Sequence, residues 1–71
     1  MAITAAALQT ALGETSGRDA TVVRNLGAVS TYQEWLVHGN GTVAGRVRMV
    51  RTTAADDAAT QAAAVLTALR A

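Results

Sequence analysis

His38 is the residue of this 71-residue chain whose type best suits chemistry, because it is the only histidine and stands beside a glycine-rich turn. A histidine can act as a general base, but catalysis also needs a nucleophile or an orienting carboxylate, and the neighbouring sequence offers neither. The chain contains no cysteine, which excludes disulfides and cysteine-rich metal sites. We therefore expect a protein that is not an enzyme, with no catalytic residue, no metal site and no cofactor.

Two further patterns have structural explanations. Asp56 and Asp57 are adjacent, so on a helix their side chains would point about 100° apart rather than converge on a metal ion. Carboxylates at that place are typical of helix capping. The glycines at 39, 41 and 45 do not match a phosphate-binding loop, because no helix begins directly behind them.

Helices are expected at both ends of the chain. Residues 2–12 fit a short helix, and Gly13 is its natural end. Its apolar stripe would be Ile3, Ala7, Leu8, Ala11 and Leu12. The closing helix is expected from about Ala54 to Arg70, with Thr53 as its N-cap and Asp56 favouring its N-terminus. Its stripe would be Ala58, Ala62, Val65, Leu66 and Leu69.

Strands are expected between the helices. The β-branched run in residues 21–26 favours a strand, although the spacing of its apolar residues would also suit one or two helical turns. The strand is the preferred interpretation, with Gly27 ending it. Residues 30–38 and 42–52 form a hairpin. The predicted fold is a single α+β domain over 1–71, an antiparallel meander with both helices on one face, in the order helix, strand, strand, strand, helix.

The turn at Gly39-Asn40-Gly41 permits either a two-residue or a three-residue connection. The two-residue register places Glu34 among apolar neighbours, which is costly, so we predict the three-residue register. Its opposite pairs are Trp35 with Gly45, Glu34 with Arg46, and Tyr32 with Arg48. Its core face, beneath the helices, would carry Trp35, Val37, Val43, Val47 and Met49.

The other face of the hairpin is either an ordinary solvated face of a sheet or an interaction surface, and the thin core favours an interaction surface. It would mix apolar side chains with tyrosine and arginine, which are enriched at protein interfaces. The arginines would pair with carboxylates of a neighbouring protein. The candidate interface residues are Tyr32, Leu36, Arg46, Arg48 and Val50.

Composition points to assembly rather than to a strongly charged ligand. The net charge of +1 argues against an electrostatic binder of nucleic acid or membrane. Neither a signal peptide nor a membrane span is expected. Alanine supplies much of the 51% hydrophobic content, and buried alanine contributes little. We therefore expect the chain to complete its core by self-association or by docking on a larger protein, and an unusually well-packed monomer is the alternative.

The helix–three strands–helix order is similar to that of double-stranded RNA-binding domains. In that family a lysine cluster at the start of the last helix grips phosphates, whereas this chain has "TTAADDAAT" there. Reversing that charge removes the dominant contribution to nucleic-acid affinity. A small bacterial binding module of this type, or a dimeric cytoplasmic regulator, is the alternative function.

The chain also resembles, in composition and style, the small structural proteins in virions of phages that infect high-GC bacteria. These are short, rich in Ala, Thr, Val and Gly, and free of cysteine. The resemblance implies a non-enzymatic, multi-copy virion component: a capsid decoration, minor capsid or head–tail protein. Its partners would be further copies or a larger capsid or tail protein, and its location the virion.

Overall fold

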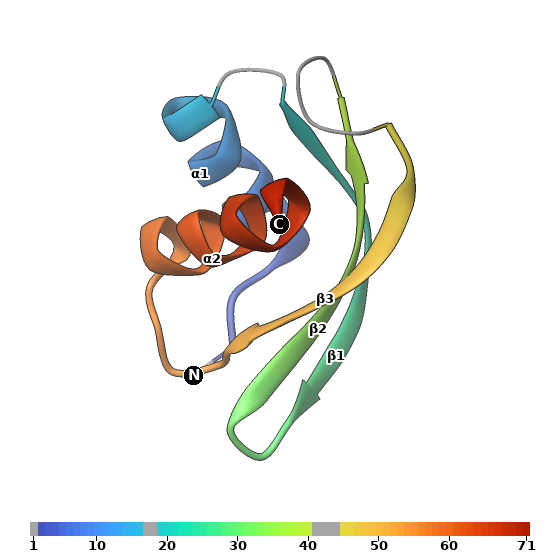
Figure 1. The fold of residues 1–71 in the computed structure, drawn as a ribbon. Helices are drawn as coiled ribbons and strands as arrows, with labels where there is room; N and C mark the ends of the chain where they lie inside the picture. Colours follow the sequence, from blue (N-terminus) through green and yellow to red (C-terminus); the bar gives the residue numbers. More distant parts are fainter. Residues whose placement is uncertain (1, 17–18, 41–44) are drawn as a thin grey trace.

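The computed structural model describes residues 2–16, 19–40 and 45–71, and it has the α+β fold expected from the sequence (Figure 1). The three strands form an antiparallel sheet in the order β1-β2-β3, between an opening and a closing helix. The elements are α1 (Ala5–Ser16), β1 (Ala20–Val29), β2 (Tyr32–Gly39), β3 (Val47–Thr53) and α2 (Ala58–Arg70).

Both helices lie on the same side of the sheet (Figure 1), and the core fills the space between the two layers. Trp35 of β2 is fully buried there, as predicted. The helices contribute most of the remaining core. Their fully or almost fully buried apolar residues are Leu8, Ala11, Leu12, Ala62, Val65, Leu66 and Leu69. The predicted stripes therefore face the sheet except at Ala7, which is not part of this core. Ala58, and Ile3 from the segment before α1, pack at the core margin.

Helix α1 begins later and ends later than expected, because it spans Ala5–Ser16 instead of residues 2–12. It begins after Thr4, whose hydroxyl accepts a hydrogen bond from the Ala7 backbone N–H at 3.1 Å, as an N-cap does. It then continues through Gly13, which was expected to end it, to Ser16. Gly13 is exposed and has an ordinary backbone conformation, so it lowers the helix propensity by about 1 kcal/mol without stopping the helix.

Strand β1 confirms the preferred interpretation of residues 21–26, but Gly27 does not end it. The strand passes through two irregularities in its pairing with β2, between Val22 and Arg24 and between Asn25 and Gly27. Each is a β-bulge, which adds a residue and bends the strand. Gly27 has φ +105°, a conformation that a side chain strongly disfavours. The glycine thus lets the strand continue past its second bulge.

The predicted register between β2 and β3 is wrong. Trp35 pairs with Val50 rather than with Gly45, and Glu34 pairs with Arg51 rather than with Arg46. The connection is longer than a tight turn, because β2 ends at Gly39 and β3 begins at Val47. Part of it, including Val43, lies outside the described residues.

The observed register differs from the predicted one by five residues of β3. Because this number is odd, every side chain of β3 lies on the face opposite to the predicted one. Val50 and Thr52 are consequently buried under the helices. Val47 and Met49, which were expected in the core, are 51% and 59% exposed. The prediction was correct for β2 and inverted for β3.

Helix α2 begins later than expected, and Asp57 caps it in place of Thr53. The Asp57 side chain accepts a hydrogen bond from the Thr60 backbone N–H at 2.8 Å. Hydrogen bonds from the Thr60 side chain and backbone lower the pKa of Asp57 below its usual value. Thr53 is the last residue of β3, and residues 54–57 connect the strand to the helix. The expectation that this acidic pair serves helix capping is confirmed for Asp57.

Candidate functional site

The sheet face that points away from the helices gathers the large apolar side chains that the described part of the chain leaves exposed. Val29, Val47 and Met49 each pair with an outward-facing residue of β2. Val23 and Leu26 are the unpaired residues of the two bulges of β1. They lie next to Arg24 and Gly27, which pair with the outward-facing Leu36 and Glu34. We call these five residues the outer apolar face: Val23, Leu26, Val29, Val47 and Met49.

The centre of this face is formed by β2, whose outward residues alternate with buried ones. Tyr32 and Leu36, both predicted for the interface, lie here and are half-buried. Arg51 of β3 stands over the Tyr32 ring, 4.4 Å from its centroid, and its Nε lies 3.5 Å from Glu34 Oε2. These contacts replace the expected pairs of Tyr32 with Arg48 and Glu34 with Arg46. Arg51 is largely exposed, so its ion pair contributes little to stability.

The three other predicted interface residues do not lie on this face. Val50 is 6% exposed and belongs to the core. Arg46 and Arg48 are on the helix side of the sheet, because they share the alternation of Val50. The cause is the inverted face of β3. The structure therefore separates Tyr32 and Leu36 from Arg46, Arg48 and Val50.

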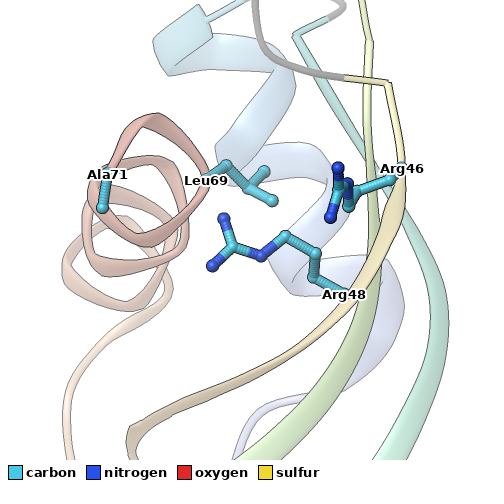
Figure 2. A pocket seen from close by; sticks show the side chains of 4 residues that line it. All are labelled: Arg46, Arg48, Leu69 and Ala71. Atoms are coloured by element: carbon cyan, nitrogen blue, oxygen red, sulfur yellow. The ribbon is translucent and has the colours of Figure 1, made fainter.

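Arg46 and Arg48 line a shallow pocket of about 360 Å³ with Leu69 and Ala71. Both arginine side chains extend from the β3 side toward the end of α2 (Figure 2). Arg48 Nη1 donates a hydrogen bond to the Ala68 carbonyl oxygen at 3.0 Å. A guanidinium at this place satisfies one of the last carbonyls of the helix and complements its dipole. The contact that the structure gives Arg48 is thus one that stabilises the end of α2.

His38 takes part in a hydrogen-bonded chain at the end of β2. Its Nδ1 lies 2.8 Å from Asn40 Oδ1, and Asn40 Nδ2 donates to the Thr21 hydroxyl, also at 2.8 Å. The Asn40 backbone N–H also donates to the Asp19 carbonyl. These contacts give His38 a role in joining the ends of β1 and β2.

A buried polar chain beneath Trp35 has no counterpart among the predicted residues. Trp35 Nε1 donates to the Thr52 hydroxyl at 2.9 Å, and that hydroxyl donates to Gln61 Oε1 at 2.6 Å. Gln61 Nε2 then donates to the Asp56 carbonyl at 3.0 Å. Gln61 is fully buried, and its place beside the apolar stripe of α2 was the available sequence signal.

A second buried amide joins the N-terminal segment to the sheet. Gln33 Nε2 donates to the Ile3 carbonyl at 2.7 Å, and Gln33 Oε1 accepts from the Ile3 N–H at 3.3 Å. Among the described residues, every buried side-chain polar atom has a hydrogen-bond partner. Both sets of buried hydrogen bonds therefore have a structural role, and their polar groups are all paired.

Comparisons with protein-family models, with curated proteins and with solved structures found no match. Within residues 2–16, 19–40 and 45–71, no three His, Asp or Glu side chains are grouped as a metal ion would require. No helix in the described ranges is long and apolar enough to cross a membrane. The candidate site is consequently defined by its surface chemistry, which is the outer apolar face with Tyr32, Leu36 and Arg51.

Proposed function

We propose that this chain is a non-enzymatic assembly protein that associates with further copies of itself as a multi-copy structural component of a phage virion. The observation that carries the proposal is the outer apolar face. One side of the sheet is covered by two helices, whereas the other exposes the five apolar residues of that face. Apolar side chains exposed on the uncovered face of a sheet favour a protein–protein contact there.

The chemistry of the face favours protein over nucleic acid. Aliphatic side chains surround one tyrosine and the ion pair of Glu34 with Arg51. Tyrosine, methionine and arginine are enriched at protein interfaces, and this face carries Tyr32, Met49 and Arg51. The virion assignment adds the compositional resemblance to small phage structural proteins, namely a short cysteine-free chain rich in alanine and threonine.

Double-stranded RNA binding is less well supported, although the order of elements is the same. The N-terminus of α2, where that family places its lysines, carries Asp56 and Asp57. Arg46 and Arg48 lie at the opposite end of α2, beside Leu69 and Ala71. A phosphate at the start of this helix would meet carboxylates instead of cations.

Sedimentation velocity over a hundredfold range of concentration tests the proposal. We expect species larger than a monomer at the upper end, and we expect Val23→Glu to shift the equilibrium toward the monomer. Thr10→Glu is the matched control, because it adds the same charge at an exposed position of α1. Quantitative mass spectrometry of purified particles should then find a fixed, high copy number.

Two results would refute the proposal. One is a monomer at every concentration, with no incorporation into particles. The other is salt-dependent RNA binding by an otherwise monomeric chain, which would favour the RNA-binding alternative.

A further inference from the structure

Strand β3 presents an open edge of the sheet. Two backbone hydrogen bonds show which residues of β2 and β3 are hydrogen-bonded to each other. The Gly39 N–H donates to the Arg46 carbonyl, and the Ala54 N–H donates to the Thr31 carbonyl. Hydrogen-bonded and non-hydrogen-bonded pairs alternate along antiparallel strands. The backbone N–H and C=O groups of residues 48, 50 and 52 therefore point toward β2. Those of Val47, Met49 and Arg51 point in the opposite direction, outward from the open edge. In the described residues, no hydrogen bond to these outward backbone groups is found.

The opposite edge of the sheet, along β1, is obstructed. The Gln9 side chain of α1 accepts a hydrogen bond from the Val22 N–H at 2.7 Å and donates to the Ala20 carbonyl at 3.2 Å. These are outward backbone groups of β1, so Gln9 occupies that stretch of the edge. The two bulges then disrupt the remainder. Covering and bulging are both ways in which proteins prevent edge pairing.

Neither a covering side chain nor a bulge is found on β3 within the described residues, so its arginines are the only protective feature there. Its pairing with β2 is regular from Val47 to Thr53. The side chains of Val47 and Met49 are more than half exposed. A regular edge strand with exposed apolar side chains is a template for pairing with another strand. We propose that β3 pairs antiparallel with β3 of a second copy, about a two-fold axis through Met49, and so forms a six-stranded sheet.

The sequence of β3 selects this register. With the axis at Met49, Val47 lies opposite Arg51 of the partner subunit, and the outward groups of all three residues are satisfied. Axes at Arg48 or at Arg51 would place an arginine directly opposite its own copy, which is destabilising. An axis at Val50 also keeps the arginines apart, but it is less favourable. The Thr53 carbonyl would then have to accept a second hydrogen bond besides that from the Asp56 N–H at 3.1 Å.

The charges also agree with a second copy as the occupant. On the helix side, the Met49-centred register places Arg48 opposite Val50 of the partner subunit. No two arginines of β3 are directly opposed in it, so two copies can pair about a two-fold axis without like charges meeting. The two outer apolar faces become one continuous surface. The inference rests on the proposed function, because it specifies how the copies associate.

Cysteine cross-linking and amide exchange test the pairing in the full chain, which has no native cysteine. In the proposed dimer, the two copies of residue 49 have Cα atoms about 5.5 Å apart, within the range of a disulfide. We expect Met49→Cys to form a disulfide-linked dimer under mild oxidation. Val47→Cys is the matched control, because its two copies would be about 14 Å apart, too far for a disulfide.

Amide exchange measured by NMR at low and high concentration supplies the second readout. We expect the amides of Val47, Met49 and Arg51 to exchange fast in the monomer and slowly in the dimer, while residue 50 is protected in both. Assembly in which these three amides remain fast would overturn the edge pairing and leave the proposed function intact. Cross-linking of Val47→Cys in preference to Met49→Cys would overturn the register. A monomer at all concentrations would overturn the edge pairing, and its absence from purified particles would overturn the proposed function as well.

Discussion

Thr52 links the sheet to the closing helix through a single hydroxyl group. It accepts from the Trp35 indole and donates to the Gln61 amide oxygen, all within the core. A fully satisfied buried polar chain fixes one arrangement of its members, because any other arrangement leaves polar groups unpaired. The Thr52 hydroxyl therefore helps to select the register that places Val50 beside Trp35.

The first prediction concerns this hydroxyl. Thr52→Val has almost the same shape but leaves the Trp35 N–H and the Gln61 oxygen without their partner. Each unsatisfied buried group costs about 1–3 kcal/mol, so we expect unfolding in urea to require at least ~2 kcal/mol less free energy. Thr52→Ser is the control, because it retains the hydroxyl. If the valine variant were as stable as the serine variant, the polar chain would contribute nothing to stability.

At the level of elements, Gly27 and Gly13 illustrate two different uses of glycine. Gly27 has a left-handed backbone conformation at a bulge of β1, and Gly13 lies within α1 with an ordinary φ. A Cβ would meet no atom within 4 Å at either place. The effect of a side chain at each position is therefore decided by the backbone.

The second prediction compares alanine at these two glycines. Gly27→Ala should destabilise the fold by on the order of 1–2 kcal/mol, the cost of a left-handed residue that has a Cβ. Gly13→Ala should stabilise it by about 0.5–1 kcal/mol, because alanine favours the helix and restricts the unfolded chain. Thermal melts of both variants measure the difference. Equal shifts of the melting temperature would contradict the assignment of the bulge.

The order and type of the elements could be predicted because their signals are local. The apolar stripe of α2 and the alternation of β2 around Trp35 are each contained within one segment. The register of β3 could not be predicted in the same way. Gly39-Asn40-Gly41 suggests a tight turn, whereas the register depends on contacts across the sheet, such as that of Trp35 with Thr52.

The same distinction decides how much of the candidate site was visible in the sequence. Tyr32 and Leu36 belong to β2, whose face the alternation determines correctly. Val47 and Met49 belong to β3, so their exposure depended on the register. Val23 and Leu26 are at the two bulges of β1. In the sequence, Gly27 was the one residue that could have indicated a bulge in this strand.

For the whole molecule, the accessible surface of 4149 Å² is close to the about 4,100 Å² that folded monomers of 7.2 kDa have. A single chain thus has an ordinary exposed area for its size. The case for assembly accordingly depends on where the exposed apolar side chains are placed. That a single chain is poorly stable stays a prediction. It is best tested by measuring thermal stability as a function of protein concentration.

The last prediction is that thermal stability rises with chain concentration. If folding is linked to dimer formation, a tenfold increase adds about 1.4 kcal/mol per dimer, or ~0.7 kcal/mol per chain. For a domain of this size, that corresponds to about 3–5 °C in Tm. Met49→Lys should remove the dependence, because two lysines would face each other across the axis while the exposed side chain leaves the core unchanged.

Ala63→Lys is the matched control for this variant, because it adds the same charge at an exposed position of α2. It should retain the rise of Tm with concentration. At low concentration, where the monomer dominates, both variants should melt close to the unmodified chain. A melting temperature of the unmodified chain that stays constant across a hundredfold range would contradict the linkage. The ordinary surface area of the single chain would then reflect a monomer that is stable without a partner.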